Sequence, residues 1–258
     1  GYVYEKVYEF NSDNAEGATA TFTAPLDFEY NSNMKYLAVY PSLEYNEDGN
    51  YYYSGDVAQP TFRLDEYQNK LTSDFQQKEN SAIYQSPDGV GHLKNYDAMF
   101  SIVEFDGAVA DVEFIKLNAV IKWELQFPDS VKGEDVYTFI FESRDSKENH
   151  LRMYGQLHFW DIFKENRRSW STSNPWQRLI FNLGHRSQTN GLTVPDDGKL
   201  DVYMPVLADK YNQIMHADER YFLLIDGKFA ADAQPPKDIV FEPGKVYVFK
   251  VNLVEQVQ

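Results

Sequence analysis

The sequence predicts an all-β protein, and three observations lead to this fold class. Apolar and polar residues alternate with a period of two in many short segments along the 258 residues. Gly, Pro, Asn and Asp occupy nearly every gap between these segments, where strands would turn. Aromatic residues make up 16% of the chain, with 19 Tyr and 18 Phe, and they favour strands. Many short strands separated by such turns indicate sandwiches or barrels.

The alternating segments follow one another along the whole chain. In order, the predicted strands are 2–10, 18–24, 35–40, 98–105, 111–114, 119–127, 136–141, 151–159, 178–182, 200–206, 221–225 and 245–253. Two segments, 65–76 and 160–166, lack clear alternation and could each hold a helical turn, but neither has an apolar stripe. Helices are therefore expected to contribute little to the fold.

Two acidic turn segments, 46–50 and 195–199, superficially resemble calcium-binding loops. They lack the alternating oxygen ligands and the distal Glu of an EF-hand loop. Asp and Gly also permit the positive φ angles of tight turns between strands. We therefore expect both segments to be hairpin turns.

Charge and cysteine content exclude several partners and chemistries. The net charge of -16 repels phosphate backbones, so nucleic acid is not an expected partner. The absence of cysteine rules out disulfides, thiolate catalysis and cysteine-based zinc sites. No apolar run approaches the ~20 residues that a membrane-spanning helix needs.

Catalytic motifs are also absent from the sequence. It contains no GxSxG, Walker A, HExxH or GxGxxG motif. The five histidines are scattered, so no metal or cofactor site is predicted. We therefore predict that the chain is not an enzyme. A glycoside hydrolase with a carboxylate pair stays an alternative, because the 40 acidic residues offer many pairs that sequence cannot rank.

Three of the four tryptophans, Trp160, Trp170 and Trp176, lie close together in the sequence. Trp170 and Trp176 flank a polar loop that contains a proline. Flat rings on such a loop could stack on a sugar or anchor a protein partner. They could equally fill the end of a sandwich core, because tryptophan is usually well buried. Both interpretations stay open.

A domain boundary is predicted near residues 106–112. Asp106 and Gly107 form a turn after the strand at 98–105, and a new alternating series begins beyond it. We therefore divide the chain into an N-terminal domain, 1–110, and a C-terminal domain, 111–258.

The last predicted strand follows a turn at Gly244 and Lys245. Its alternation gives it two faces. One face is mixed and carries Val246, Val248, Lys250 and Asn252; the other is apolar and carries Tyr247, Phe249, Val251 and Leu253. The apolar face is expected to pack against a core, and the strand edge must be paired or covered. Residues 254–258 beyond it reach at most ~18 Å when extended.

A family resemblance is carried by the stretches 17–24, 35–41 with its AVYP ending, 95–100, 112–123, 201–206 and 241–253 with its PGKVY turn and strand. Taken in order, these stretches resemble the fimbrillin family of type V pili. Together they span most of the chain, although 144–191 matches nothing in the family. Asn118 stands where the family commonly has a histidine.

The resemblance implies two tandem β-sandwich domains with a transthyretin-like Greek-key topology. It also implies export as a lipoprotein and a place in a fimbria or on the outer membrane of a Gram-negative cell. Contact with a membrane is then expected only through a lipid anchor outside this sequence. Fimbrillin subunits assemble by β-strand addition, in which a strand of one subunit fills a groove in its neighbour.

The leading hypothesis is a non-catalytic pilus subunit, or an accessory or tip component, that acts in adhesion. Its expected partners are other pilus subunits and a glycan or protein receptor on a host or bacterial surface. The candidate assembly residues are those of the last strand: Val246, Tyr247, Val248, Phe249, Val251 and Leu253. The short segment beyond that strand favours a position at a pilus end. The alternative is a surface glycan-binding protein that uses Trp160, Trp170 and Trp176.

Overall fold

The computed structural model describes residues 35–40, 61–64, 67–68, 90, 93, 99–104, 112–143, 155–158, 170–171, 178–184, 191–208 and 214–256. Within these residues the regular structure is almost entirely β-strand, with no α-helix. The 3₁₀ turn η3 (Asp129–Val131) and Leu93, which is also in a 3₁₀ conformation, are the exceptions. The predicted all-β fold class is confirmed. The described part of the chain contains no helix with the length and hydrophobicity needed to cross a bilayer.

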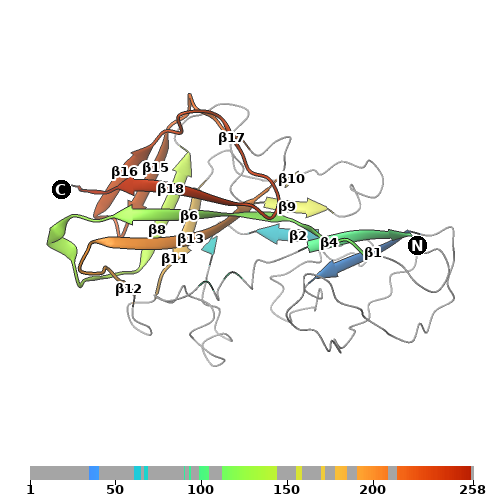
Figure 1. Cartoon of the computed structure of the whole chain (residues 1–258), viewed down its shortest axis with the longest axis horizontal. Coiled ribbons are helices and arrows are strands. Elements are labelled where there is room, and N and C mark those ends of the chain that lie inside the picture. Colours follow the sequence, from blue (N-terminus) through green and yellow to red (C-terminus); the bar gives the residue numbers. More distant parts are fainter. Residues whose placement is uncertain are drawn as a thin grey trace.

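The strands follow one another as Figure 1 shows. The first are β1 (Lys35–Tyr40), β2 (Thr61–Leu64), β3 (Tyr67–Gln68), β4 (Met99–Glu104) and β5 (Ile115–Lys116). Next come β6 (Asn118–Gln126), β7 (Asp135–Val136), β8 (Thr138–Ser143), β9 (Gly155–His158), β10 (Trp170–Ser171), β11 (Arg178–Asn182), β12 (Leu192–Thr193) and β13 (Lys199–Leu207). The last are β14 (Ile214–Met215), β15 (Tyr221–Ile225), β16 (Phe229–Ala233), β17 (Ile239–Val240), β18 (Val246–Asn252) and β19 (Val254–Glu255).

Two sheets form a sandwich in the C-terminal half. One has the order β19-β16-β15-β8-β11-β3, and the other has the order β13-β6-β18. Alternate residues are buried along 119–126 of β6 and 199–204 of β13, as expected for strands with one face on a core, and the last four residues of β13 are all buried. Between the sheets, Trp123 of β6 lies 5.8 Å from Phe139 and 5.0 Å from Phe141 of β8, centroid to centroid. The core therefore joins the two sheets around this tryptophan.

The chain passes from one sheet to the other at Leu253. Its backbone N–H donates to the Gln126 carbonyl at 2.9 Å, next to the end of β6. Beyond it, β19 pairs antiparallel with β16, and Gln256 N–H donates to the Lys228 carbonyl at 2.8 Å. The Leu253 side chain is buried between the two sheets. One continuous segment, β18 and β19, thus closes a corner of the sandwich.

The strands of the N-terminal half take part in three sheets. β1 and β5 flank β4 in one of them. β2 pairs antiparallel with β9, which also pairs with β10, and β3 pairs parallel with β11. Strands on either side of the predicted boundary near residue 110 are therefore hydrogen-bonded to each other. The two-domain division and the Greek-key topology stay predictions.

Several predicted strands are confirmed, and some details are wrong. The segments 35–40, 178–182 and 221–225 match β1, β11 and β15 at both ends. Residues 112–114 are not a strand: they are exposed and unpaired with any described strand. A helical turn is excluded at Tyr67–Gln68, which form β3, because their backbone extends to join the edge of the large sheet. The other predictions at 2–10, 18–24, 46–50 and 160–166 lie outside the described residues.

The segment 195–199 is a turn, as predicted, but it does not close a hairpin. Gly198 has φ of 72° and donates its N–H to the Pro195 carbonyl at 2.8 Å. The strands on its two sides have different partners, because β12 pairs with β7 whereas β13 pairs with β6. The turn thus carries the chain from one small sheet into the sandwich.

Candidate functional site

β18 is an edge strand of its sheet, and one side of its backbone faces no described strand. At its two ends, Lys245 accepts a hydrogen bond from Val120 N–H, and Leu253 donates one to Gln126. The N–H and C=O of one residue point to the same side of a strand, and successive residues alternate. The odd-numbered residues therefore bond to β6. We call the outward N–H and C=O groups of Val246, Val248 and Lys250 the free edge of β18.

The side chains of the same three residues are open to solvent. Val246 is 60% exposed and Val248 is 53% exposed, and the side chain of Lys250 is 82% exposed. On the other face, Tyr247, Phe249 and Val251 are half-buried against the core, and Leu253 is buried. The two predicted faces of this strand are confirmed. The role of these residues in assembly stays a prediction.

A set of polar contacts holds the start of β18 in place. Gly244 has φ of 75° and donates its N–H to the Asn118 carbonyl at 2.8 Å. The Tyr247 hydroxyl donates to the Val240 carbonyl at 2.6 Å and accepts from the Glu242 N–H at 2.8 Å. The predicted Gly244 turn is therefore present, and Tyr247 ties β18 to the segment before it.

Next to the edge, the outward face of the sheet carries a charge network. Lys122 of β6 contacts Asp201 of β13 at 2.8 Å and Glu124 at 2.9 Å, and Lys250 lies 3.4 Å from Glu124. The hydrogen bond to Asp201, and then that to Glu124, raises the pKa of Lys122. The hydrogen bond from Lys122 lowers the pKa of Glu124. Tyr203 lies beside the network, with its ring centre 5.8 Å from the Lys122 ammonium.

Of the three predicted binding tryptophans, the structure describes only Trp170. Trp170 lies in β10, with its Cα opposite that of Leu157 in β9. Trp160 and Trp176 lie outside the described residues. The fourth tryptophan, Trp123, is completely buried in the sandwich core. The glycan-binding hypothesis therefore stays a prediction.

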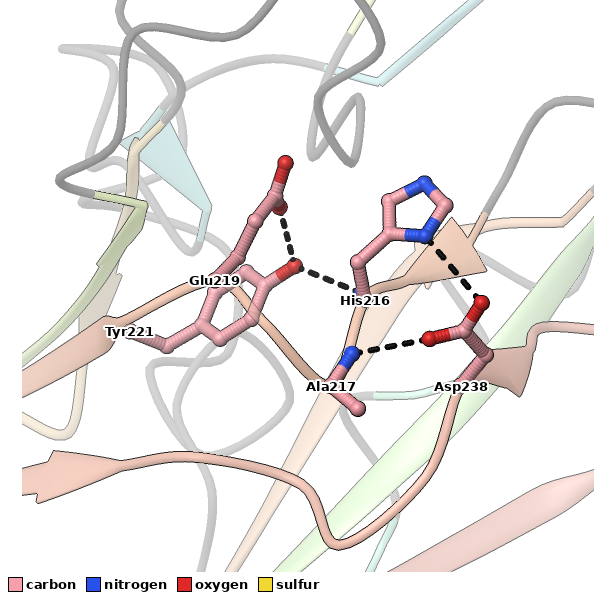
Figure 2. A network of polar contacts seen from close by, with 5 residues as sticks. All are labelled: His216, Ala217, Glu219, Tyr221 and Asp238. Atoms are coloured by element: carbon pink, nitrogen blue, oxygen red, sulfur yellow. Dashed lines mark hydrogen bonds and ion pairs between the residues drawn. The ribbon is translucent and has the colours of Figure 1, made fainter.

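A second polar cluster surrounds Tyr221 of β15 (Figure 2). The buried Tyr221 hydroxyl donates to the Glu219 carboxylate at 2.6 Å and accepts from the His216 N–H at 3.1 Å. Asp238 accepts from the Ala217 N–H at 2.8 Å, and its other oxygen lies 3.3 Å from His216 Nδ1. The Ala217 N–H, and then His216, lowers the pKa of Asp238.

This cluster joins β15 to the two-stranded sheet of β14 and β17. His216 directly follows β14, and Asp238 directly precedes β17, so their contact clamps the two strands at one end. The Tyr221 hydroxyl bonds to a backbone N–H and to a carboxylate of the same chain, so this buried polar group is satisfied within the protein. Among the described residues, no group of three or more His, Asp or Glu could hold a metal ion.

Sequence reasoning missed both the charge network and the Tyr221 cluster. The sequence offered one local signal for the first, because Lys122 and Glu124 alternate with buried residues along β6. Asp201 joins them through pairing of β13 with β6, opposite Glu124. The cluster around Tyr221 depends on the approach of His216 to Asp238, which are 22 positions apart, and no local pattern predicts it.

No protein-family model matches the sequence, and no curated protein matches it. Three similar solved structures, from species of Bacteroides, are each described as a "putative cell adhesion protein". The Bacteroides ovatus protein is 11% identical, with a TM-score of 0.45, and the match covers 92% of this chain and 73% of that chain. The Bacteroides uniformis protein is 13% identical, with a TM-score of 0.38, and the coverage is 87% and 71%.

The third structure, from Bacteroides thetaiotaomicron, is 9% identical with a TM-score of 0.31. The match covers 60% of this chain and 53% of that chain. All three likenesses are distant, and none of them assigns a function to this chain.

Proposed function

We propose that this chain is a non-catalytic component of a cell-surface fimbria that acts in adhesion and assembles by β-strand addition. It serves as a pilus subunit or as an accessory or tip component, exported as a lipoprotein and held at the outer membrane. The ordered fimbrillin-like motifs in the sequence support the family assignment. The observation that carries the mode of assembly is the free edge of β18.

Edge strands are normally protected, because their open N–H and C=O groups can pair with another chain. Of the seven residues of β18, Lys250 alone is charged. The flanking Val246 and Val248 side chains are exposed rather than covered. An added strand would satisfy the backbone groups and cover both valines, and backbone bonding of this kind is how strand addition gains affinity.

Limited proteolysis with trypsin tests this function, read by intact mass and size-exclusion chromatography. A pilus subunit is expected to lose an N-terminal segment sharply and then to grow into oligomers. A protein that stays intact and monomeric after trypsin treatment would contradict polymerisation by strand exchange. Titration with sugars, followed by tryptophan fluorescence in Trp170→Ala and Trp176→Ala variants, would then test the glycan-binding alternative.

A further inference from the structure

We propose that the free edge of β18 accepts an extended segment of another protein, with apolar side chains opposite Val246 and Val248 and a carboxylate opposite Lys250. This inference rests on the proposed function and deepens it. It specifies the acceptor edge and the chemistry of the incoming strand, neither of which follows from strand addition in general.

The backbone groups at the free edge of β18 are complementary to those of an extended polypeptide. Its outward N–H and C=O groups recur at every second residue, at Val246, Val248 and Lys250. In a strand this repeat is about 6.6–6.8 Å, and a neighbouring β-strand presents complementary groups at the same repeat. The row ends near Asn252, where the chain leaves the sheet for β19 and β16.

The side chains of the edge define the sequence of the incoming strand. Residues directly opposite each other in paired strands place their side chains on the same face of the sheet. Apolar residues opposite Val246 and Val248 would therefore cover two valines that are now more than half exposed. A carboxylate opposite Lys250 would meet an ammonium group whose partner in the described structure is Glu124, at 3.4 Å.

The charge of the surrounding face fits an acidic segment. The side chains on the solvent-facing side of β6, β13 and β18 include three lysines and two carboxylates, and three minus two gives a local charge of +1. These residues are Lys122, Lys199, Lys250, Glu124 and Asp201. The whole chain carries -16. An acidic strand would thus meet less repulsion here than the net charge suggests.

A second copy of β18 fits this edge less well than a segment of a different sequence. Antiparallel self-pairing centred on Val248 would place Lys250 opposite the apolar Val246 of the other copy. Self-pairing centred on Lys250 would place two ammonium groups opposite each other, which is destabilising. The charge of Lys250 therefore opposes edge-to-edge association of identical chains and favours a carboxylate-bearing partner.

Short capped peptides provide the probe for this edge. Two are synthesised with alternating threonine and valine and one glutamate, placed at either end so that both strand directions are represented. We expect at least one peptide to bind the full chain and to slow hydrogen exchange of the outward amides of Val246, Val248 and Lys250. Replacing its glutamate by lysine should weaken binding about two- to fivefold, which is the effect expected from losing roughly one favourable cross-strand pair.

Substitutions in the protein locate the binding edge. Lys250→Glu should reverse the preference between the glutamate and lysine peptides. Lys199→Glu is the matched control, because it makes the same charge change on β13, at the opposite edge of the same face, and it should leave the preference unchanged. Equal peptide preference in the wild type and in Lys250→Glu would overturn the predicted chemistry of the partner.

Val248→Pro tests the backbone contact itself. It removes an N–H that points away from β6, so the internal ladder of hydrogen bonds stays complete, and proline is tolerated at such edge positions. We expect this variant to fold and to lose peptide binding. If it fails to fold, peptides N-methylated on alternate residues give the same information with wild-type protein. Binding that is insensitive to N-methylation on either side of the peptide would overturn the edge contact.

The same variant separates this inference from the proposed function. If trypsin-treated wild type and Val248→Pro form oligomers equally well, β18 is not the acceptor, although strand assembly stands. If peptides protect β18 but no oligomers form, the acceptor edge stands and the polymerising function fails. Protection of β18 that increases with protein concentration in the absence of peptide would identify a second copy as the occupant and overturn the proposed partner.

Discussion

The indole ring of Trp123 on β6 lies 5.0 Å from the phenyl ring of Phe249 on β18, centroid to centroid. This contact joins the edge strand to the aromatic centre of the core. The outward neighbour of Phe249, Val248, makes no such contribution, because its side chain points to solvent. Substitutions at Phe249 therefore test the stability of β18, whereas substitutions at Val248 test whether its edge can pair with another strand.

Phe249→Ala is expected to lower the free energy of unfolding by about 2–3 kcal/mol, below the usual range for a fully buried phenylalanine because Phe249 is only half-buried. Urea unfolding followed by circular dichroism measures the change. Val248→Thr, which keeps a β-branched side chain at an exposed position, should alter stability by no more than about 0.5 kcal/mol. Equal losses in both variants would show that the Trp123 contact does not anchor the strand.

Asp226 is expected to be a stabilising residue of the turn between β15 and β16. Its carboxylate accepts the N–H groups of Thr138 at 2.8 Å and Tyr137 at 3.1 Å, and its φ is 50°. Asp226→Ala should cost about 1–3 kcal/mol, because it leaves these groups without their acceptor. Thermal unfolding measures this cost. Asp232→Ala, at an exposed position of β16, is the control, and a similar loss there would argue against the role of the turn.

The Tyr221 hydroxyl is expected to be worth more than an exposed hydroxyl. Tyr221→Phe removes the donor to the buried Glu219 and the acceptor of the His216 N–H, so we expect a loss of about 2–3 kcal/mol. A double-mutant cycle with Glu219→Gln, measured by urea unfolding, isolates the bond between the two side chains. Additive effects of the two substitutions would mean that this hydrogen bond contributes nothing to stability.

Glu124 should contribute stability that depends on pH. The Lys122 ammonium lowers the pKa of Glu124 below its ordinary value of 4.5, so the folded protein binds this proton more weakly than the unfolded chain. The contribution is then fully present well above pH 4.5 and is lost as the pH falls through the lowered pKa. The stability gap between wild type and Glu124→Gln should therefore narrow between roughly pH 6 and pH 3.

Chemical unfolding at several pH values measures that gap. Glu113→Gln, at an exposed position before β5, provides the comparison with a charge change outside the network. A gap for Glu124→Gln that stays constant across the acidic range would show that Lys122 and Glu124 are not coupled in solution.

Sequence patterns predicted the strands whose side chains alternate between core and solvent, such as β11 and β15. They missed β16, because its sequence FAADA is rich in alanine and aspartate, which have low strand propensity. The sequence feature that indicates a strand pair here is the dipeptide Asp226-Gly227. This pair favours a tight turn between two strands, and both residues have positive φ in the structure.

The candidate site could be predicted only in part, for a physical reason. The two faces of β18 follow from alternation within one segment, so the sequence was sufficient for them. Its place at a sheet edge depends on which strand it pairs with. That strand is β6, which lies far away in the chain, so the sequence of β18 alone does not reveal the pairing. The same limit applies to Lys122, whose strongest partner, Asp201, comes from a different strand.

The position of β18 beside β6 also has a kinetic consequence. Val246 pairs with Val120, so 126 positions (246 minus 120) separate two neighbours in one parallel ladder. Contacts between residues so distant in sequence slow folding, because a long loop must close before the contacts form. Before β18 pairs with β6, Trp123 lacks its contact with the Phe249 ring on one side of the forming core. A ribosome-bound chain that ends before β18 is therefore expected to remain sensitive to protease at β6, and release of the complete chain should bring protection.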